Sequence, residues 1–330
     1  MIPSAFSRML ARCLVLCTAA YATFASVPAI AQDYPAKPIR LVVPNPPGGV
    51  TDLLARIVSE RLGALYGQPL VVDNKAGASG HLGAQQVAKA AADGYTLLLG
   101  TIGIHAAYAS YSKLNYDPAA ELTTVTILTE SPNVVLVPAA SPLRSFGELL
   151  ARAKSDPASL NYATAGPGSS VHMVTALFET TSGARVNYVP YKGSGPAMVD
   201  LIGGQVQVMF ENLPSGVPHI QSGRVRALAV TGGQRDPRLP TVPTIAESGL
   251  PDYRAMSWFT VAVPRGTPKL IVDKLARDLQ QVMSVPDVAA QLDKLGNTLV
   301  ANSPSQAKQF IDDETVKWNR VIKATRLQLD

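Results

Sequence analysis

The sequence predicts an α/β protein of two similar lobes, each a parallel sheet covered by helices. Short apolar runs alternate with amphipathic helical patterns along almost the whole chain. The alternation forms two sets, and a long apolar, β-branched run at Val125–Val137 lies between them. Alternating strands and helices favour parallel strands with helices on the faces of the sheet. The run between the sets is long enough to leave one sheet and enter another, although a single sheet of nine strands would give the same order.

The first residues have the pattern of an export signal. Residues 1–12 carry Arg8 and Arg12 and no acid, an apolar run follows, and Ala29-Ile30-Ala31 is a small-x-small motif. This order is typical of a cleavable secretory signal peptide. We therefore predict a signal peptide over residues 1–31 and a periplasmic location. A membrane anchor is the alternative, against which the shortness of the apolar run argues.

The first set of elements follows the predicted signal peptide. Its strands are short apolar runs bounded by Gly or Pro, and its helices have apolar residues at helical spacing. The predicted strands are Ile39–Pro44, Leu70–Val72 and Tyr95–Leu99, and the predicted helices are Thr51–Leu65 and Leu82–Ala91.

The second set follows the long apolar run and repeats the alternation. It comprises helices Ser145–Lys154, Ser170–Ser182 and Pro196–Ile202 with strands Asn161–Thr164, Asn187–Pro190 and Val206–Phe210. The β-type run Val225–Thr231 could carry the chain back to the first lobe, where Trp258–Val263 adds a strand. Three helical patterns end the chain, at Pro268–Met283, Pro286–Leu295 and Pro304–Lys323. We therefore predict lobe 1 over 32–131 and 232–330 and lobe 2 over 132–231.

The composition excludes several classes of protein. The chain has 330 residues, of which 47% are hydrophobic and 16% charged, and this supplies enough apolar material for about two domains. The formal net charge of +5 is scattered rather than gathered on one stripe, so we expect no nucleic-acid partner. Both cysteines, Cys13 and Cys17, lie in the predicted signal peptide. The mature chain is therefore expected to have no disulfide and no cysteine metal ligand.

Glycine-rich turns follow four of the predicted strands and lead directly into helices. In parallel α/β sheets, ligands bind outside the carboxyl ends of the strands. Glycines allow close approach to the backbone, and the first helical turn offers unpaired N–H groups, so such turns suit an anion. Each turn taken alone could also be a simple connection with an N-cap. The four turns are 46–52, 77–80, 165–170 and 193–196.

Motifs for other chemistries are missing from the sequence. No G-x-G-x-x-G or phosphate-loop pattern follows the strands, and no G-x-S-x-G occurs. The four histidines lack H-x-x-x-H spacing, so we expect no metal, and no cofactor is implied. His172 stands near a helix start, where capping or packing is its simplest role. We therefore expect no catalytic residues.

At these turns the sequence resembles the extracytoplasmic solute receptors of tripartite tricarboxylate transporters, the Bug family. The matching blocks occur in family order over essentially the whole predicted mature chain. They include PIRLVVPNPPGGVTD, LNYATAGPGSSVH, VPYKGSGPAMVDLIGGQVQVMFENLPS and SWFTVAVPRGTP. The resemblance implies a type II periplasmic-binding-protein fold, with two α/β lobes joined by two crossing strands and the ligand cleft between them.

The resemblance also implies how the ligand is held. A carboxylate would be gripped by main-chain amides and small hydroxyls of facing loops, without a metal or cofactor. In lobe 1 and at the crossing strand the implied contacts are Pro47, Gly48, Gly49, Thr51, Asp52, Thr101, Gly103, Trp258 and Phe259. In lobe 2 they are Thr164, Ala165, Gly166, Gly168, Ser169, His172, Tyr191, Glu211 and Asn212.

Two departures from the family pattern lie against the expected pocket. Asn45 replaces a frequent aromatic residue, and Pro167 replaces a commonly polar one. The ligand could therefore be a di- or tricarboxylate, an amino acid or an aromatic carboxylate. The resemblance implies a monomer that delivers its ligand to membrane permease subunits. A receptor that presents its loaded form to a sensor kinase is an alternative, as is an exported enzyme using His172 with Asp52 or Glu211.

Overall fold

The computed structural model describes residues 34–111 and 113–327. Every described strand and helix lies within the unit Lys37–Asp330. The predicted signal peptide, residues 1–31, lies outside the described residues. Among the described residues, no helix is both long enough and apolar enough to cross a membrane.

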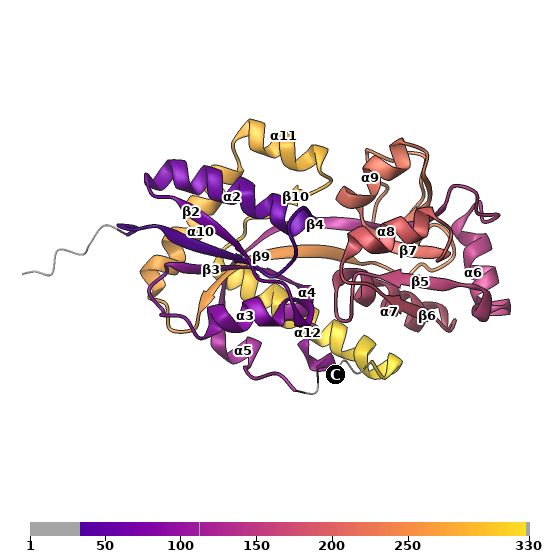
Figure 1. The fold of residues 1–330 in the computed structure, drawn as a ribbon, viewed down its shortest axis with the longest axis horizontal. Coiled ribbons are helices and arrows are strands. Elements are labelled where there is room, and N and C mark those ends of the chain that lie inside the picture. The colour runs from indigo at the N-terminus through magenta and orange to yellow at the C-terminus, as the bar shows by residue number, and fades with distance from the viewer. Residues whose placement is uncertain (1–33, 112, 328–330) are drawn as a thin grey trace, which may run out of the picture. The chain divides into compact units, whose positions relative to one another are not determined.

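Strands and helices alternate along this unit, and one connected path of strands runs through it (Figure 1). The order of the path is β2-β1-β3-β9-β4-β7-β5-β6, and β8 and β10 pair with β4 beside it. The strands are β1 Ile39–Val43, β2 Leu70–Asn74, β3 Thr96–Thr101, β4 Leu122–Pro138, β5 Asn161–Thr164, β6 Asn187–Pro190, β7 Val208–Asn212, β8 Val225–Val230, β9 Met256–Pro264 and β10 Thr298–Leu299.

Lobe 1 comprises the elements around β1, β2, β3 and β9, and lobe 2 comprises those around β5, β6 and β7. Within lobe 1, β1 pairs in parallel with both β2 and β3, and within lobe 2, β5 pairs in parallel with β6 and β7. The carboxyl ends of these strands are therefore the places where each lobe can present its loops to a ligand.

Helices follow the parallel strands, as the alternation predicts. The long helices are α2 Val50–Tyr66, α3 His81–Ala88, α6 Phe146–Ser155, α7 Ser170–Ser182, α8 Ser194–Ile202, α9 Leu213–Gln221, α10 Lys269–Met283, α11 Pro286–Lys294 and α12 Pro304–Thr325. The short ones are α4 Ile102–His105, α5 Pro118–Glu121 and the 3₁₀ turns η1 Ala78–Gly80, η2 Tyr108–Ser110 and η3 Pro157–Ser159.

Strand β4 is shared by the two lobes. Residues 122–132 pair with β9 of lobe 1, and residues 133–136 pair with β7 of lobe 2. Two register shifts against β9 and one against β8 interrupt the ladders of this strand, and such bulges increase bending and twist. The predicted run Val125–Val137 is thus confirmed as a strand that leaves one lobe and enters the other.

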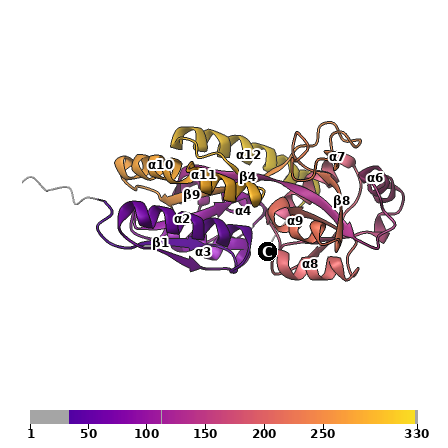
Figure 2. The same ribbon diagram turned by 90° about the horizontal axis from the view of Figure 1, so that it is seen from above.

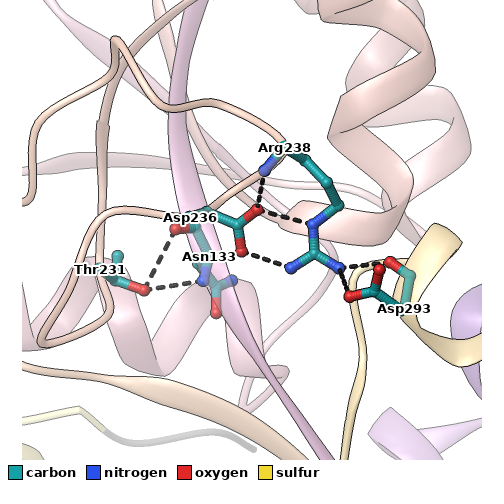
Figure 3. A network of polar contacts seen from close by, with 5 residues as sticks. All are labelled: Asn133, Thr231, Asp236, Arg238 and Asp293. Carbon is teal, nitrogen blue, oxygen red and sulfur yellow. Dashed lines mark hydrogen bonds and ion pairs between the residues drawn. The ribbon is translucent and has the colours of Figure 1, made fainter. Parts of the chain in front are cut away.

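Asn133 ties several segments together at the crossing point. Its backbone N–H donates to the Thr231 hydroxyl at 2.7 Å (Figure 3). Its side-chain amide donates to the Phe210 carbonyl at 2.9 Å, and its side-chain oxygen accepts from the Ser257 hydroxyl at 2.7 Å. A single buried asparagine therefore links β4, β7, β9 and the end of β8, which fixes where the lobes meet.

A second polar link follows β8, also drawn in Figure 3. Arg238 pairs with the buried carboxylate of Asp236, with its Nε 2.6 Å from Oδ1, and it also donates to the Asp293 carbonyl at the end of α11. The connection between β8 and β9 packs on lobe 2 as well, because the Tyr253 hydroxyl donates to the Val174 carbonyl in α7 at 2.8 Å.

The largest core cluster joins both lobes through the last helix. Phe146, Phe178 and Phe210 of lobe 2 share this cluster with Trp258 of β9 and Trp318 of α12. Helix α12 contacts β4 and α7, and Figures 1 and 2 both show it beside them. Apolar burial beneath α12 therefore connects the two lobes on one face of the protein. The loops that follow the strands of lobe 1 and lobe 2 meet at a different place.

Candidate functional site

The loop after β1 is held in shape by Asp52, which lies in the first turn of α2 and is only 2% exposed. The Gly48 N–H donates to its Oδ2 at 3.0 Å, and the Arg56 guanidinium donates at 2.9 Å. The Asn74 amide donates to Oδ1 at 3.0 Å and to the Asn45 carbonyl at 3.1 Å. The carboxylate predicted to contact ligand is thus bound by the chain itself, and it braces the turn.

Hydrogen bonding decides the charge of Asp52. Burial alone would raise its pKa, but the hydrogen bonds from Arg56, Gly48 and Asn74 and the charge of Arg56 lower the pKa below its ordinary value of 3.8. Asp52 is therefore ionised at neutral pH, and Arg56 neutralises its charge within the loop.

The start of α2 remains available to a ligand. Pro47, Gly48 and Gly49 are exposed, and no side chain caps the helix at Gly49. Gly48 has a φ of +89°, which an L-residue rarely adopts. Thr51 lies in the first helical turn and is buried. The exposed loop and the uncapped N–H groups of this turn fit an anion site made of backbone.

The loop after β3 brings lobe 1 against lobe 2. Thr101 is the N-cap of α4, and Gly103 lies inside that short helix. A Cβ added to Gly103 would stand 2.7 Å from the Gly168 carbonyl oxygen, closer than real Cβ atoms come. The loop after β3 and the predicted glycine-rich turn 165–170 therefore meet, backbone against backbone, and only glycine fits at position 103.

The lobe 2 loop from Ala165 to Ser169 is a tight turn closed by its own hydrogen bonds. Gly166 and Gly168 have φ values of +108° and +70°. The Ser169 hydroxyl donates to the Gly166 carbonyl at 2.7 Å and accepts from the His172 N–H at 3.2 Å, so it caps α7. Ala165 is half-buried and packs on the lobe 2 core. Of this loop, only Pro167 is exposed.

His172 lies under this loop as a neutral acceptor. The Gly168 N–H donates to Nδ1 at 3.1 Å, which leaves the ring proton on Nε2. The ring stands edge-on to Tyr188, with centroids 4.8 Å apart. Burial lowers the pKa of His172 to about 4, so the imidazole is uncharged at neutral pH. Nε2 is buried and has no partner among the described residues.

Three further predicted residues lie at the ends of β5 and β7. The Thr164 hydroxyl is buried without a partner among the described residues. Asn212 accepts from the Ser170 hydroxyl and from the Asn133 amide, each at 3.3 Å. Glu211 is fully buried, its Oε1 accepts from the Ser194 hydroxyl and the Asn212 N–H, and its Oε2 has no partner in the described chain.

Of the three aromatic residues predicted for the site, Trp258 and Phe259 are buried and Tyr191 is half-buried. The Tyr191 hydroxyl donates to Asp200 of α8 at 2.7 Å. The Trp258 indole is 1% exposed and donates to Glu314 of α12 at 3.0 Å. Phe259 of β9 is 4% exposed, and its partners in the sheet register are Thr101 of β3 and Thr129 of β4. Trp258 thus fills the core beneath α12 in this structure.

Sequence reasoning missed two lobe 1 side chains that reach lobe 2. The Ser79 hydroxyl donates to the Pro167 carbonyl, and the Tyr111 hydroxyl donates to the same oxygen at 3.0 Å. Residues 77–80 all have positive φ, although Ala78 and Ser79 are not glycines. The Gly77–Gly80 spacing marked this turn in the sequence, but no local signal pointed to Tyr111.

The two buried histidines of lobe 1, His81 and His105, are also uncharged. Burial lowers the pKa of both His81 and His105 to about 4. His81 Nδ1 lies 2.8 Å from the Tyr116 hydroxyl, and His105 Nε2 lies 3.0 Å from the Thr260 hydroxyl. Within residues 34–111 and 113–327, no group of three or more His, Cys, Asp or Glu side chains could hold a metal ion.

Several known proteins are similar to this chain in sequence and in fold. The tripartite tricarboxylate transporter family receptor matches residues 54–327. The chain is similar to R. palustris Rpa4515 with adipate, at 40% identity and a TM-score of 0.84, with 88% of this chain and 98% of that chain covered. It is similar to MatC (Rpa3494) from Rhodopseudomonas palustris with bound malate, at 34% identity and a TM-score of 0.82, covering 88% and 100%. Periplasmic binding protein BugD is 32% identical, with a TM-score of 0.82, covering 89% and 99%.

The two lobes, the shared strand β4 and these likenesses define a type II periplasmic-binding-protein fold of mixed α/β type. The chain belongs to the tripartite tricarboxylate transporter receptor family, and its similarity to BugD places it among the Bug proteins. The fold and the family predicted from the sequence are both confirmed.

Proposed function

We propose that the protein is a periplasmic receptor that captures a small organic carboxylate by lobe closure and delivers it to the permease subunits of a tripartite tricarboxylate-type transporter. The meeting of Gly103 with Gly168 carries the proposal, because it brings the loops of the two lobes together. Adipate and malate, bound in two similar structures, are both dicarboxylates. This supports a carboxylate as the ligand.

The ligand contacts are proposed at the loops after β1, β3 and β5 and at the ends of β5 and β7. The exposed start of α2 would supply main-chain N–H groups, and Thr101 and Thr164 would supply hydroxyls. Hydrogen bonds to a charged ligand contribute roughly 1.5–3 kcal/mol each, so two or three of them, less the cost of association, fit micromolar affinity. Asp52 and Trp258 would act indirectly, since each is held by the chain itself.

The remaining parts of the proposal concern processing and organisation. Cleavage after Ala31 would leave a periplasmic, monomeric chain in two lobes, with lobe 1 over 32–131 and 232–330 and lobe 2 over 132–231. Binding without chemistry is favoured because His172 is uncharged and already accepts from Gly168, while Arg56 engages Asp52.

Isothermal titration calorimetry of the full chain with adipate, malate, citrate, glutamate and benzoate tests the proposal. We expect at least one of them to bind with micromolar affinity. In Gly103→Ala the new methyl group would meet the Gly168 carbonyl and hinder closure, so we expect at least a tenfold weaker affinity. Gly147→Ala in α6 is the matched control, because its Cβ has room. No binding to any of these acids, or full affinity in Gly103→Ala, would contradict the proposal.

A further inference from the structure

Two hydroxyl groups of lobe 1 converge on a single carbonyl oxygen of lobe 2. Ser79, in η1, and Tyr111, just after η2, both donate to the Pro167 oxygen. Neither is among the residues proposed to hold the ligand. These bonds join protein to protein, so they are available to the closed lobes whatever ligand lies between them.

The lobe 1 side of this contact is built to hold its donors in place. Ser79 has φ of +51° and ψ of +32°, between the positive-φ glycines Gly77 and Gly80. A non-glycine residue keeps such a conformation only where its surroundings over-determine it. The Tyr111 ring stands edge-on to His81, with centroids 4.5 Å apart, and His81 is itself bonded to Tyr116. The turn conformation of Ser79 and the ring contact of Tyr111 are thus both made within lobe 1.

The lobe 2 side presents its carbonyl outward. Gly166 accepts the bonds that close the turn, from the Ser169 backbone and hydroxyl, and the Gly168 N–H is bound by His172. The turn is therefore satisfied without the Pro167 oxygen. Its proline, which cannot donate a backbone hydrogen bond, stands exposed at the tip between two positive-φ glycines.

We propose that Ser79 and Tyr111 form a latch on the Pro167 carbonyl that holds the lobes closed independently of ligand. The latch lowers the free energy of the closed state alone, so it raises the closed fraction of the ligand-free protein. A ligand that needs the closed state then binds more tightly by the same factor, whatever its identity. The inference rests on the proposed lobe closure but not on the choice of ligand.

The distance between two spin labels, measured by double electron–electron resonance on the ligand-free full chain, tests the latch directly. Cys13→Ser and Cys17→Ser remove the native thiols, and spin labels are placed on cysteines replacing Val71 of β2 and Val199 of α8. These side chains are 52% and 68% exposed, so labels there should not disturb packing. Unfolding and refolding removes any ligand that copurifies. We expect wild type to show two distances, for open and closed lobes.

Tyr111→Phe keeps the ring beside His81 and removes only the hydroxyl. Loss of one hydrogen bond should lower the closed-to-open ratio by about 2- to 12-fold, and Ser79→Ala combined with Tyr111→Phe should lower it further. The Kd of every carboxylate that binds should rise by the factor by which the closed fraction falls. Tyr188→Phe is the control, because it removes a tyrosine hydroxyl bonded to Glu179 within lobe 2 and should leave the ratio unchanged.

Three outcomes would overturn the latch: no closed fraction in ligand-free wild type, a ratio unaffected by Tyr111→Phe, or a Kd that rises for one carboxylate only. The last would mean that the Tyr111 hydroxyl contacts the ligand. Failure of the proposed carboxylate-receptor function would give a different result from failure of the latch. A closed fraction that falls in Tyr111→Phe, in a protein that binds none of the acids, would sustain the latch and reject the carboxylate receptor.

Discussion

Replacing Glu211 by glutamine should make the protein more stable at pH 8 than wild type, by a margin that is absent at pH 4. Glu211 is fully buried at the end of β7, where its Oε1 accepts from the Ser194 hydroxyl at 3.1 Å and the Asn212 N–H at 2.7 Å. Burial raises the pKa of the carboxyl from its ordinary 4.5 to about 7, although both hydrogen bonds act to lower it. The neutral carboxyl is therefore the form that the fold favours.

The pKa shift sets the sign and the size of the effect. Because the pKa of Glu211 is raised on folding, its contribution to stability is complete below pH 4.5 and is lost as pH rises to about 7. A shift of one pKa unit corresponds to 1.36 kcal/mol, so the loss amounts to about 3 kcal/mol. Glutamine keeps an oxygen for both donors and cannot ionise, so Glu211→Gln escapes this loss.

Urea unfolding of wild type and Glu211→Gln at several pH values between 4 and 8 measures the effect. Other carboxylates titrate equally in both proteins, so the difference between the two free energies of unfolding isolates Glu211. We expect that difference to grow by about 3 kcal/mol in favour of the variant as the pH rises. A difference that stays constant, or that grows in favour of wild type, would refute the assignment of a buried, neutral carboxyl.

Two further predictions concern residues that support the site. Asp52→Ala should cost about 2 kcal/mol of stability at pH 7, because Gly48 and Asn74 lose their acceptor. Since the pKa of Asp52 is lowered, the part of its contribution that depends on its charge is lost as pH falls below 3.8, and thermal unfolding should show a smaller deficit at pH 2.5 than at pH 7. Trp258→Phe should cost about 1–2 kcal/mol, through the bond to Glu314 and lost packing, without changing ligand preference in calorimetry. A changed order of affinities would place the indole at the ligand.

Strong hydrophobic periodicity made most helices and strands predictable from the sequence. It did not predict helix α9. Helix α7 begins and ends as predicted, at Ser170 and Ser182, because its apolar residues recur at helical spacing after a serine N-cap. Helix α9 contains Pro214, Gly216 and Pro218, residues of poor helix propensity. It forms because Leu213 and Val217 pack into the lobe 2 core. Tertiary burial of this kind is invisible to a local pattern.

The turns of the site were predictable, but their partners were not. Glycines after strands indicated positive φ and close approach, and Gly48, Gly166 and Gly168 do have positive φ. The sequence also singled out Pro167 as a departure from the family pattern, but it did not indicate which contact Pro167 makes. Its contact with Ser79 spans 88 positions and depends on how two lobes approach, which no spacing encodes. Whether the predicted residues touch a ligand stays a prediction.

The charges around the loops suit an anion without any cationic side chain. None of the residues assigned to the site from the sequence is a lysine or arginine, so attraction must come from backbone N–H groups. Repulsion between the anion and the carboxylates near the loops must then be weakened as well. Arg56 neutralises Asp52 within the loop, and burial shifts Glu211 towards its neutral form. Burial likewise keeps His81, His105 and His172 uncharged, so the loops owe their electrostatics to peptide dipoles that change little between pH 6 and pH 8. Burial raises the pKa of Glu211 to about 7, within that range, so Glu211 is a residue through which pH would alter the affinity for an anion.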